Sequence, residues 1–400
     1  MKKQVTGFIL AVSFMLALTT GASAQQAGPN PIKIGGSLPL TGIYSETAKL
    51  IKAGYEFWAD DVNKRGGLLG RPVRLTIRDD ESNTDKAITY YERAITVDNV
   101  DLVFGGYPAT SNVALMPLME KYGKVFLGMG GQLPSFEQGY TYSFASPPLI
   151  SDWPALALSG VVEDLIPKAE RPKNMAILTM NNVIGLTTKP SMLKMAERNG
   201  IKTVVDEVYN LPLSDATPLV SKAKGRNADL LVCLSFFDDG VMVARAAKAM
   251  NYNPTLMFQL IASTIPAWMK EMGPEGNNVI AGTPWSFKLP FKYNELINNG
   301  AKERLKLPAA PIYFGFGFSW VKTLELAVQG AGTLDNAKIR DYLRANKFDL
   351  PYGNGITFDK RGLPAPFQYA IQTTNGQTEL IWPKSVATTK LVYPRPVWGK

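Results

Sequence analysis

Short apolar runs alternate with longer amphipathic segments along the first part of the chain. Residues 32–40 and 71–80 contain β-rich apolar runs, whereas residues 45–67 repeat apolar side chains every three or four positions and end in two glycines. These patterns predict a strand, a helix that stops at the glycines, and a second strand. Elements in this order predict parallel strand pairing, with ligand loops at the carboxyl ends of the strands.

The same alternation continues to residue 131, pauses, and starts again at residue 174. Before the pause it predicts a helix over 112–123 with only a short first turn before Pro117. After the pause it predicts strands at 174–180, 201–209, 228–236, 255–261 and 278–286, helices at 186–200, 217–227, 238–251, 312–332 and 335–346, and two strands around a turn within 355–376. We therefore expect an α/β protein with two doubly wound, Rossmann-like lobes and a ligand cleft between them.

Each lobe is predicted to be discontinuous, because connections near residues 149, 282 and 360 are expected to pass between the lobes. The predicted first lobe comprises 31–148 with 283–358, and the second comprises 149–282 with 359–390. Residues 391–400 form a proline-rich, basic tail, for which we expect an extended course over the surface with few ladder hydrogen bonds.

The amino-terminal residues have the pattern of a secretory signal peptide. Lys2 and Lys3 precede an apolar run from Val5 to about Leu18, and a small-x-small sequence ends at Ala24. The alternative, a membrane anchor, is disfavoured because this run is shorter than the roughly 20 residues that span a bilayer. We predict that residues 1–24 are removed and that the mature protein is periplasmic.

Composition excludes several kinds of chemistry. The chain of 400 residues is 46% hydrophobic, has no histidine, and contains a single cysteine, Cys233, within a run typical of a buried strand. Histidine triads and the commonest metal ligand are therefore absent, and no phosphate-binding loop or nucleophile elbow is present. The net charge of +9, or +7 without the two lysines of the signal peptide, is spread evenly, so a nucleic-acid partner is not expected. We predict no enzyme activity, no cofactor and no metal.

Three long stretches resemble a known family. They are "IKIGGSLPLTGIYS", "DVNKRGGLLGRPVRLTIRDDESNTDKA" and "VDLVFGGYPATSNVALMPLMEKYGKVFLG", and "GITFDKRGLPAPFQYAIQ" adds a fourth near the end. From Pro31 to about Pro383 the chain resembles the leucine/isoleucine/valine-binding proteins of ABC importers, which have the type I periplasmic binding fold. The resemblance implies a monomer whose two lobes close on a small solute and deliver it to a membrane permease.

In the first lobe, two glycine-rich polar loops are expected to line the cleft. A helix start with free N–H groups and neighbouring hydroxyls forms an anion site. The proposed ligands for a solute carboxylate are Thr110, Ser111, Gly130, Gly131 and Gln132. Thr110 and Ser111 also suit helix capping, and the resemblance favours both roles. Tyr44 and Tyr107 are predicted to place aromatic rings against the solute.

In the second lobe, the corresponding loops are apolar. The amino-acid binders of the family have a tyrosine where Ile184 aligns, another near Phe236, and near Ile261 an acid that receives the ammonium group. Phe237 is also predicted to line the cleft, and Trp153 either shields the solute or packs at the crossing between lobes. An ammonium group buried without a partner is costly.

Asp238 and Asp239 could replace the missing acid, but they open a predicted helix, where carboxylates are favoured as first-turn residues. The predicted solute is therefore a small aromatic carboxylate, such as a benzoate-like, cinnamate-like or aromatic 2-oxo acid. The alternatives are a branched-chain or other hydrophobic amino acid, and a ligand-sensing role for the same fold. A periplasmic enzyme is a third class, disfavoured by the lack of a catalytic constellation.

Overall fold

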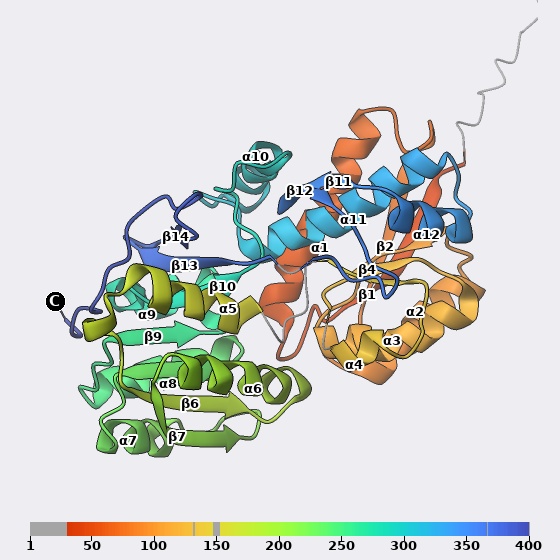
Figure 1. Ribbon diagram of the computed structural model, residues 1–400. Coiled ribbons are helices and arrows are strands. Elements are labelled where there is room, and N and C mark those ends of the chain that lie inside the picture. Colours follow the sequence, from red (N-terminus) through yellow and green to blue (C-terminus); the bar gives the residue numbers. More distant parts are fainter. Residues whose placement is uncertain (1–29, 131–132, 147–152, 366, 400) are drawn as a thin grey trace, which may run out of the picture.

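The computed structural model describes residues 30–130, 133–146, 153–365 and 367–399. They form two α/β lobes that lie side by side, each built around its own sheet (Figure 1). This confirms the predicted fold class. None of the helices in the described ranges combines the length and the apolar character that a membrane crossing needs.

The first lobe has a three-stranded sheet in the order β2-β1-β3 and a parallel pair, β4 and β5. Its strands are β1 (Ile32–Leu38), β2 (Val73–Asp79), β3 (Leu102–Val103), β4 (Phe126–Gly128) and β5 (Ser143–Ala145), and a hairpin of β11 (Phe348–Leu350) and β12 (Gly353–Ile356) follows later in the chain. Its helices are α1 (Ser45–Lys64), α2 (Thr84–Thr96), α3 (Ala109–Tyr122), α4 (Leu133–Phe136), α10 (Asn294–Leu305), α11 (Ile312–Ala331) and α12 (Asn336–Ala345). β1 pairs in parallel with β2 and β3, as the alternation of strands and helices predicts.

Helices α1 and α11 pack closely because glycines lie at their contact. A Cβ atom added at Gly54 would come within 2.3 Å of the Phe314 carbonyl oxygen, and one at Gly317 would come as close to the Ile51 carbonyl oxygen. Further along both helices, the Trp58 indole N–H donates to the buried Glu325 carboxylate at 2.7 Å. The two helices therefore run in the same direction, and both amino ends lie on the same side of the lobe.

The second lobe contains a seven-stranded sheet in the order β14-β13-β10-β9-β8-β6-β7. Its strands are β6 (Asn174–Met180), β7 (Lys202–Tyr209), β8 (Leu230–Leu234), β9 (Leu256–Gln259), β10 (Ile280–Thr283), β13 (Tyr369–Thr374) and β14 (Gln377–Trp382), and its helices are α5 (Trp153–Gly160), α6 (Val183–Arg198), α7 (Thr217–Gly225), α8 (Phe237–Ala249) and α9 (Ala267–Met272). The strands from β7 to β10 in this order are parallel, and β13 joins β10 antiparallel. Cys233 is fully buried in β8, where burial raises the pKa of its thiol.

Several elements differ from the sequence predictions. α3 begins at Ala109 and continues through Pro117, whose exposed position lets water reach the carbonyl that has lost its helical partner. Of the two strands predicted within 355–376, β13 pairs with β10 and β14, whereas β12 ends at Ile356 and pairs with β11; a single antiparallel bridge joins Phe358 to Pro364 across the turn. The short elements α4, α5, α9, β5 and β11, together with α10 and β14, were not predicted.

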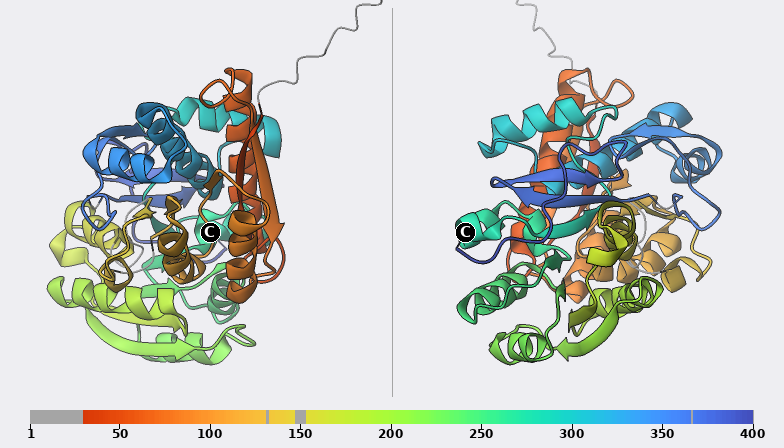
Figure 2. Two further views of the ribbon diagram at one scale, coloured as in Figure 1. Left: turned by 90° about the vertical axis from the view of Figure 1, so that its right-hand side faces the viewer. Right: turned by 60° about the vertical axis from the view of Figure 1, so that its left-hand side comes forward.

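The chain passes between the lobes from β5 to α5, from β10 to α10 and from β12 to β13 (Figure 1). The residue at which each crossing begins stays a prediction. After β14 the chain ends beside the second lobe (Figure 2), without strand pairing but with specific anchors. The Val392 N–H donates to the Gln372 side chain at 2.8 Å, and the Trp398 indole N–H donates to the Tyr252 carbonyl at 2.7 Å.

Candidate functional site

Three tyrosines of the first lobe form one wall of the space between the lobes. Tyr44 immediately precedes α1, Tyr107 follows β3, and Tyr313 lies in the first turn of α11. The Tyr107 ring meets the Tyr44 ring edge to face with centroids 6.1 Å apart, and it meets the Tyr313 ring in the same way at 5.8 Å. The parallel packing of α1 and α11 brings their amino ends together and thereby positions these rings.

The second lobe meets this wall through Phe236, at the start of α8. The Phe236 and Tyr44 rings lie edge to face with centroids 5.0 Å apart. A cavity of about 40 Å³ lies beside them, with Phe237, Asp238 and Ile261 in its lining. The structure therefore brings together four of the predicted site residues, Tyr44, Phe236, Phe237 and Ile261, with the lobes in contact.

The hydroxyl of Tyr107 is buried in the tyrosine wall without an aligned hydrogen-bond partner among the described residues. Burial raises its pKa to about 12, an effect that the nearby hydroxyls of Thr47 and Tyr313 oppose. The hydroxyls of Thr47 and Tyr313 are therefore its neighbours in the wall, and the carboxylate of a bound solute would compete with them for its proton.

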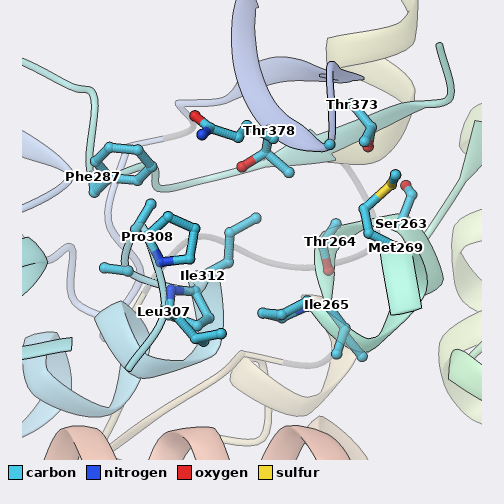
Figure 3. A pocket seen from close by; sticks show the side chains of 16 residues that line it. Ser263, Thr264, Ile265, Met269, Phe287, Leu307, Pro308, Ile312, Thr373 and Thr378 are labelled. Atoms are coloured by element: carbon cyan, nitrogen blue, oxygen red, sulfur yellow. The ribbon is translucent and has the colours of Figure 1, made fainter. Parts of the chain in front are cut away.

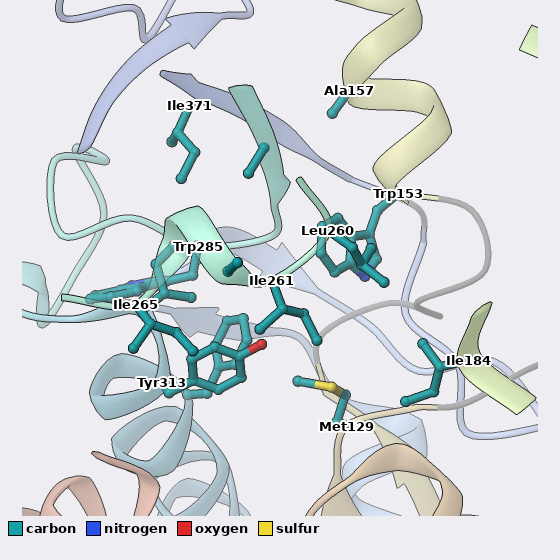
Figure 4. Close-up of a cluster of buried hydrophobic side chains, with 14 of the residues drawn as sticks. Met129, Trp153, Ala157, Ile184, Leu260, Ile261, Ile265, Trp285, Tyr313 and Ile371 are labelled. Atoms are coloured by element: carbon teal, nitrogen blue, oxygen red, sulfur yellow. The ribbon is translucent and has the colours of Figure 1, made fainter. Parts of the chain in front are cut away.

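Apolar side chains continue the site away from the tyrosines. The Tyr313 hydroxyl points toward the space between Ile261 and Met129, and Ile184 lies further along the same space (Figure 4). Ile261, Met129 and Ile184 are each buried. Since α3 contacts α6, which begins beside Ile184, the first and second lobes also meet on this side.

Trp153 lies at the start of α5, directly after the first crossing between lobes. Its ring packs over β10, where a Cβ atom added at Gly282 would approach the ring to 3.0 Å. Figure 4 shows it beside Leu260, on the same side of the cluster as Ile184. The packing alternative considered for Trp153 accounts for this position, and a contact with solute stays a prediction.

The residues predicted to bind a solute carboxylate differ in their surroundings. The Ser111 hydroxyl lies 3.0 Å from the Thr84 hydroxyl of α2, and Thr110 is half-buried in the first turn of α3. Neither caps the helix: the N-cap is Pro108, and no side chain bonds to the free amides there. The capping interpretation is therefore wrong, and the amides of the first turn remain open to an anion. Gly130 is buried next to Met129, whereas Gly131 and Gln132 lie outside the described residues.

The two acids of α8 differ in their environments. Asp239 is buried and accepts a hydrogen bond from the Tyr209 hydroxyl, and burial raises its pKa to about 6. Asp238 lines the cavity beside Tyr44; burial raises its pKa, and the charges of Glu46 and Glu271 add to this effect. As predicted, both lie in the first turn of the helix. Asp239 is therefore engaged within the second lobe, while Asp238 faces the first lobe.

Tyr313, Thr47 and Met129 are site residues that the sequence analysis missed. Tyr313 belongs to a long apolar helix, and its periodicity is that of a core residue, so only its place at the amino end of α11 marks it out. Within the described ranges, no three histidine, cysteine or acidic side chains gather in a way that could hold a metal ion. The arrangement offers apolar and aromatic surface, tyrosine hydroxyls and open helix amides, which are groups for binding.

Comparison with known proteins places this site in a context. Residues 31–377 match a family described as periplasmic binding protein. The leucine-, isoleucine-, valine-, threonine- and alanine-binding protein of Pseudomonas aeruginosa is 24% identical over 362 residues, which cover 90% of this chain and 94% of that protein.

Two solved structures share the fold. A branched-chain amino acid transporter substrate-binding protein of Streptococcus pneumoniae, in complex with isoleucine, superimposes with a TM-score of 0.78 at 17% identity, over 88% of this chain and 100% of the other. A solute-binding protein of an ABC transporter from R. palustris, in complex with benzoate, gives a TM-score of 0.76 at 15% identity, over 88% and 95% of the two chains. At such identities the similarity concerns the fold alone.

Proposed function

The chain belongs to the periplasmic binding protein family, and from this premise we propose that it captures an aromatic carboxylate for an ABC importer. The lobes close on the solute, and the closed form is delivered to a membrane permease. The solute is of the benzoate, cinnamate or aromatic 2-oxo acid kind.

The observation that carries the proposal is the contrast between the two faces of the cleft. Ile184, Phe236 and Ile261 present apolar surface from the second lobe, and the acid of this lobe in the lining of the cavity beside Tyr44, Asp238, lies at its rim. The first lobe contributes the Tyr107 hydroxyl, beside the hydroxyls of Thr47 and Tyr313, and the uncapped amino end of α3. A molecule with an apolar ring at one end and an anionic group at the other complements both faces.

Burial of an aromatic ring in the cleft is favourable, whereas burial of an unpaired ammonium group there is unfavourable. Burying a phenyl ring of about 100 Å² contributes roughly 2.5 kcal/mol at ~25 cal/mol per Å². Burying an ammonium group without a carboxylate or carbonyls to replace its water costs several kcal/mol. An aromatic acid without an amino group avoids this cost, so it is the favoured solute.

A hydrophobic amino acid is the second candidate, and one observation favours it. Asp238 faces the tyrosine wall from the rim of the cleft, where its carboxylate is positioned to accept an ammonium group. The amino-acid-binding relative from Pseudomonas aeruginosa points in the same direction. Burial and the negative charges of Glu46 and Glu271 raise the pKa of Asp238, and these charges would then favour a cationic partner.

The cellular setting follows from the family and from the amino-terminal pattern. We assign residues 1–24, which lie outside the described residues, to a cleaved signal peptide, and we place the mature protein in the periplasm as a monomer. A ligand-sensing role would use the same closure but needs an output partner. Permease and ATPase genes next to this gene would favour transport over sensing.

A thermal-shift panel on protein stripped of solute tests the proposed function. The panel contains benzoate, cinnamate and phenylpyruvate together with leucine, isoleucine and valine. A solute at one hundred times its dissociation constant stabilises the folded state by about 2.7 kcal/mol. We expect stabilisation by at least one aromatic acid; stabilisation by the amino acids alone would select the second candidate.

A further inference from the structure

A second cavity, of about 190 Å³, has Ile265 in its lining (Figure 3). Its lining and that of the cavity beside Tyr44 share only Ile265. We call it the hinge cavity, because Phe287, in the crossing segment between β10 and α10, forms part of its wall.

Both lobes contribute to the hinge cavity. The second lobe provides Ser263 and Met269, which follow β9, and Thr378 of β14. The first lobe provides the segment before α11, including Pro308, and Ile312 in the first turn of that helix. Figure 3 shows these two sets of side chains facing each other across the space. The shape of the cavity therefore depends on how the lobes are placed.

The lining is mainly apolar and carries no charged residue; its polar side chains are those of Ser263, Thr264, Thr373, Gln377 and Thr378. The side chain of Ser263 is buried, with the residue only 3% exposed, and among the described residues its hydroxyl has no hydrogen-bond partner. This orphan hydroxyl on the wall of an uncharged cavity points to a ligand with a single polar group.

We propose that the hinge cavity is a second binding site, for a small neutral molecule with one aromatic ring or a branched alkyl group of similar size and one hydroxyl or carbonyl that bonds to Ser263. An apolar cavity of about 150 Å³ is known to hold benzene, so the volume suffices for one ring. A charged molecule is excluded because the lining offers no counter-charge. The occupant thus differs in class from the carboxylate proposed for the cleft.

Occupancy of the hinge cavity is linked to lobe closure. A molecule in contact with Met269 on one lobe and Ile312 on the other stabilises the arrangement that brings these walls together. Coupling between two sites is reciprocal. The molecule in the hinge cavity therefore changes the affinity of the protein for the cleft solute by the same factor by which the cleft solute changes the affinity for the molecule in the hinge cavity. This linkage rests on the proposed function, whereas the existence of the site does not.

The probe for the site is 4-bromobenzyl alcohol, a neutral ring with one hydroxyl and an anomalous scatterer. We expect bromine density between Met269 and Ile312 in crystals of the protein soaked with the probe. Bromine density only in the aromatic cleft, or none at all, would overturn the proposal.

Calorimetry with variants tests the role of the orphan hydroxyl. Ser263→Ala should weaken probe binding about three- to tenfold, the effect of one lost hydrogen bond, and should leave folding intact because it removes an unpaired group. The matched control is Ser143→Ala, which removes another buried hydroxyl without a partner, beside a space of only about 10 Å³. Equal affinities of the two variants would contradict the assignment of Ser263.

Thr378→Phe places a ring inside the hinge cavity and should abolish probe binding while benzoate binding is kept. Probe binding that survives this change would overturn the proposed location. With benzoate at saturation, probe affinity should rise, and an unchanged affinity would contradict the linkage to closure. If benzoate binds neither to the original protein nor to the variants, the proposed function fails. The position of the bromine density would still show whether the hinge cavity binds the probe.

Discussion

The ring of Tyr44 meets the ring of Phe236 edge to face at a centroid distance of 5.0 Å, although the two residues belong to different lobes. This contact can exist only when the lobes are closed. An edge-to-face pair contributes about 0.5 to 1.5 kcal/mol beyond its area burial, so this pair forms a clasp that stabilises the closed form.

Removal of the clasp should weaken solute binding more than it weakens the fold. Phe236→Ala deletes the ring that closes over the tyrosine wall, and we expect roughly tenfold weaker binding of benzoate by calorimetry. Phe236→Tyr keeps the ring and serves as the control, with affinity near that of the original protein. Small-angle scattering with benzoate should show less compaction for the alanine variant; equal compaction of all three proteins would count against the clasp.

The buried hydroxyl of Tyr107 gives a second prediction. If it donates to the solute carboxylate, Tyr107→Phe should weaken benzoate binding by about 1.5 to 3 kcal/mol and lower stability by no more than about 1 kcal/mol, the effect of losing its interactions with the Thr47 and Tyr313 hydroxyls. Tyr91→Phe is the matched control, because the Tyr91 hydroxyl already donates to the Phe104 carbonyl at 3.0 Å. That change should lower stability without affecting binding. The reverse pattern would show that Tyr107 has only a packing role.

Asp238→Asn separates the two candidate solutes. A carboxylate solute is repelled by Asp238 and by the nearby Glu46, so the neutral variant should bind benzoate about two- to fivefold more tightly, with a smaller dependence on salt. If the solute is an amino acid, the same change should weaken leucine binding instead. Calorimetry at low and high ionic strength measures both effects, with exposed Asp85→Asn as the control for the loss of one charge.

Asp239 predicts a pH dependence of stability. Its pKa in the folded protein is raised to about 6 by burial, above its ordinary value near ~4 in the unfolded chain. The folded state therefore binds the proton more tightly, so this contribution to stability is complete below pH ~4 and is lost as the pH rises through 6.

Asp239→Asn should then be more stable than the original protein at pH 7.5, by roughly 1 to 3 kcal/mol, with the difference shrinking toward pH 4. Urea unfolding at both pH values measures this, and Asp85→Asn serves as an exposed control. The stability of the Asp239→Asn variant should still depend on pH in part, because burial also raises the pKa of Asp80 to about 6. A variant less stable than the original protein at pH 7.5 would contradict the sign of this effect.

Local patterns were sufficient to predict the two lobes, and they singled out several of the residues that the structure brings together in the candidate site. Tyr44 and Phe236 each directly precede a helix, at loops that the alternation of strands and helices identifies. Trp58 and Trp320, which lie within the amphipathic segments predicted as helices over 45–67 and 312–332, are both buried in the core. α10 was missed because its sequence is polar, with little apolar periodicity to mark it.

The missed parts of the site depend on contacts between distant segments. Tyr313 joins the tyrosine wall because Gly54 and Gly317 let α1 and α11 approach closely, which no local pattern reveals. Ser111, expected to be free for a solute, instead lies against Thr84 of a neighbouring helix. The hinge cavity combines segments from both lobes, so its existence depends on how the lobes meet.

Calorimetry on solute-stripped protein, with benzoate, cinnamate and phenylpyruvate compared against leucine, tests the central claim most directly. Ring burial favours an aromatic carboxylate, and an ammonium group among Ile184, Phe236 and Ile261 is disfavoured. We predict that at least one of the aromatic acids binds tenfold or more tightly than leucine. Tight leucine binding without any response to the aromatic acids would contradict the account.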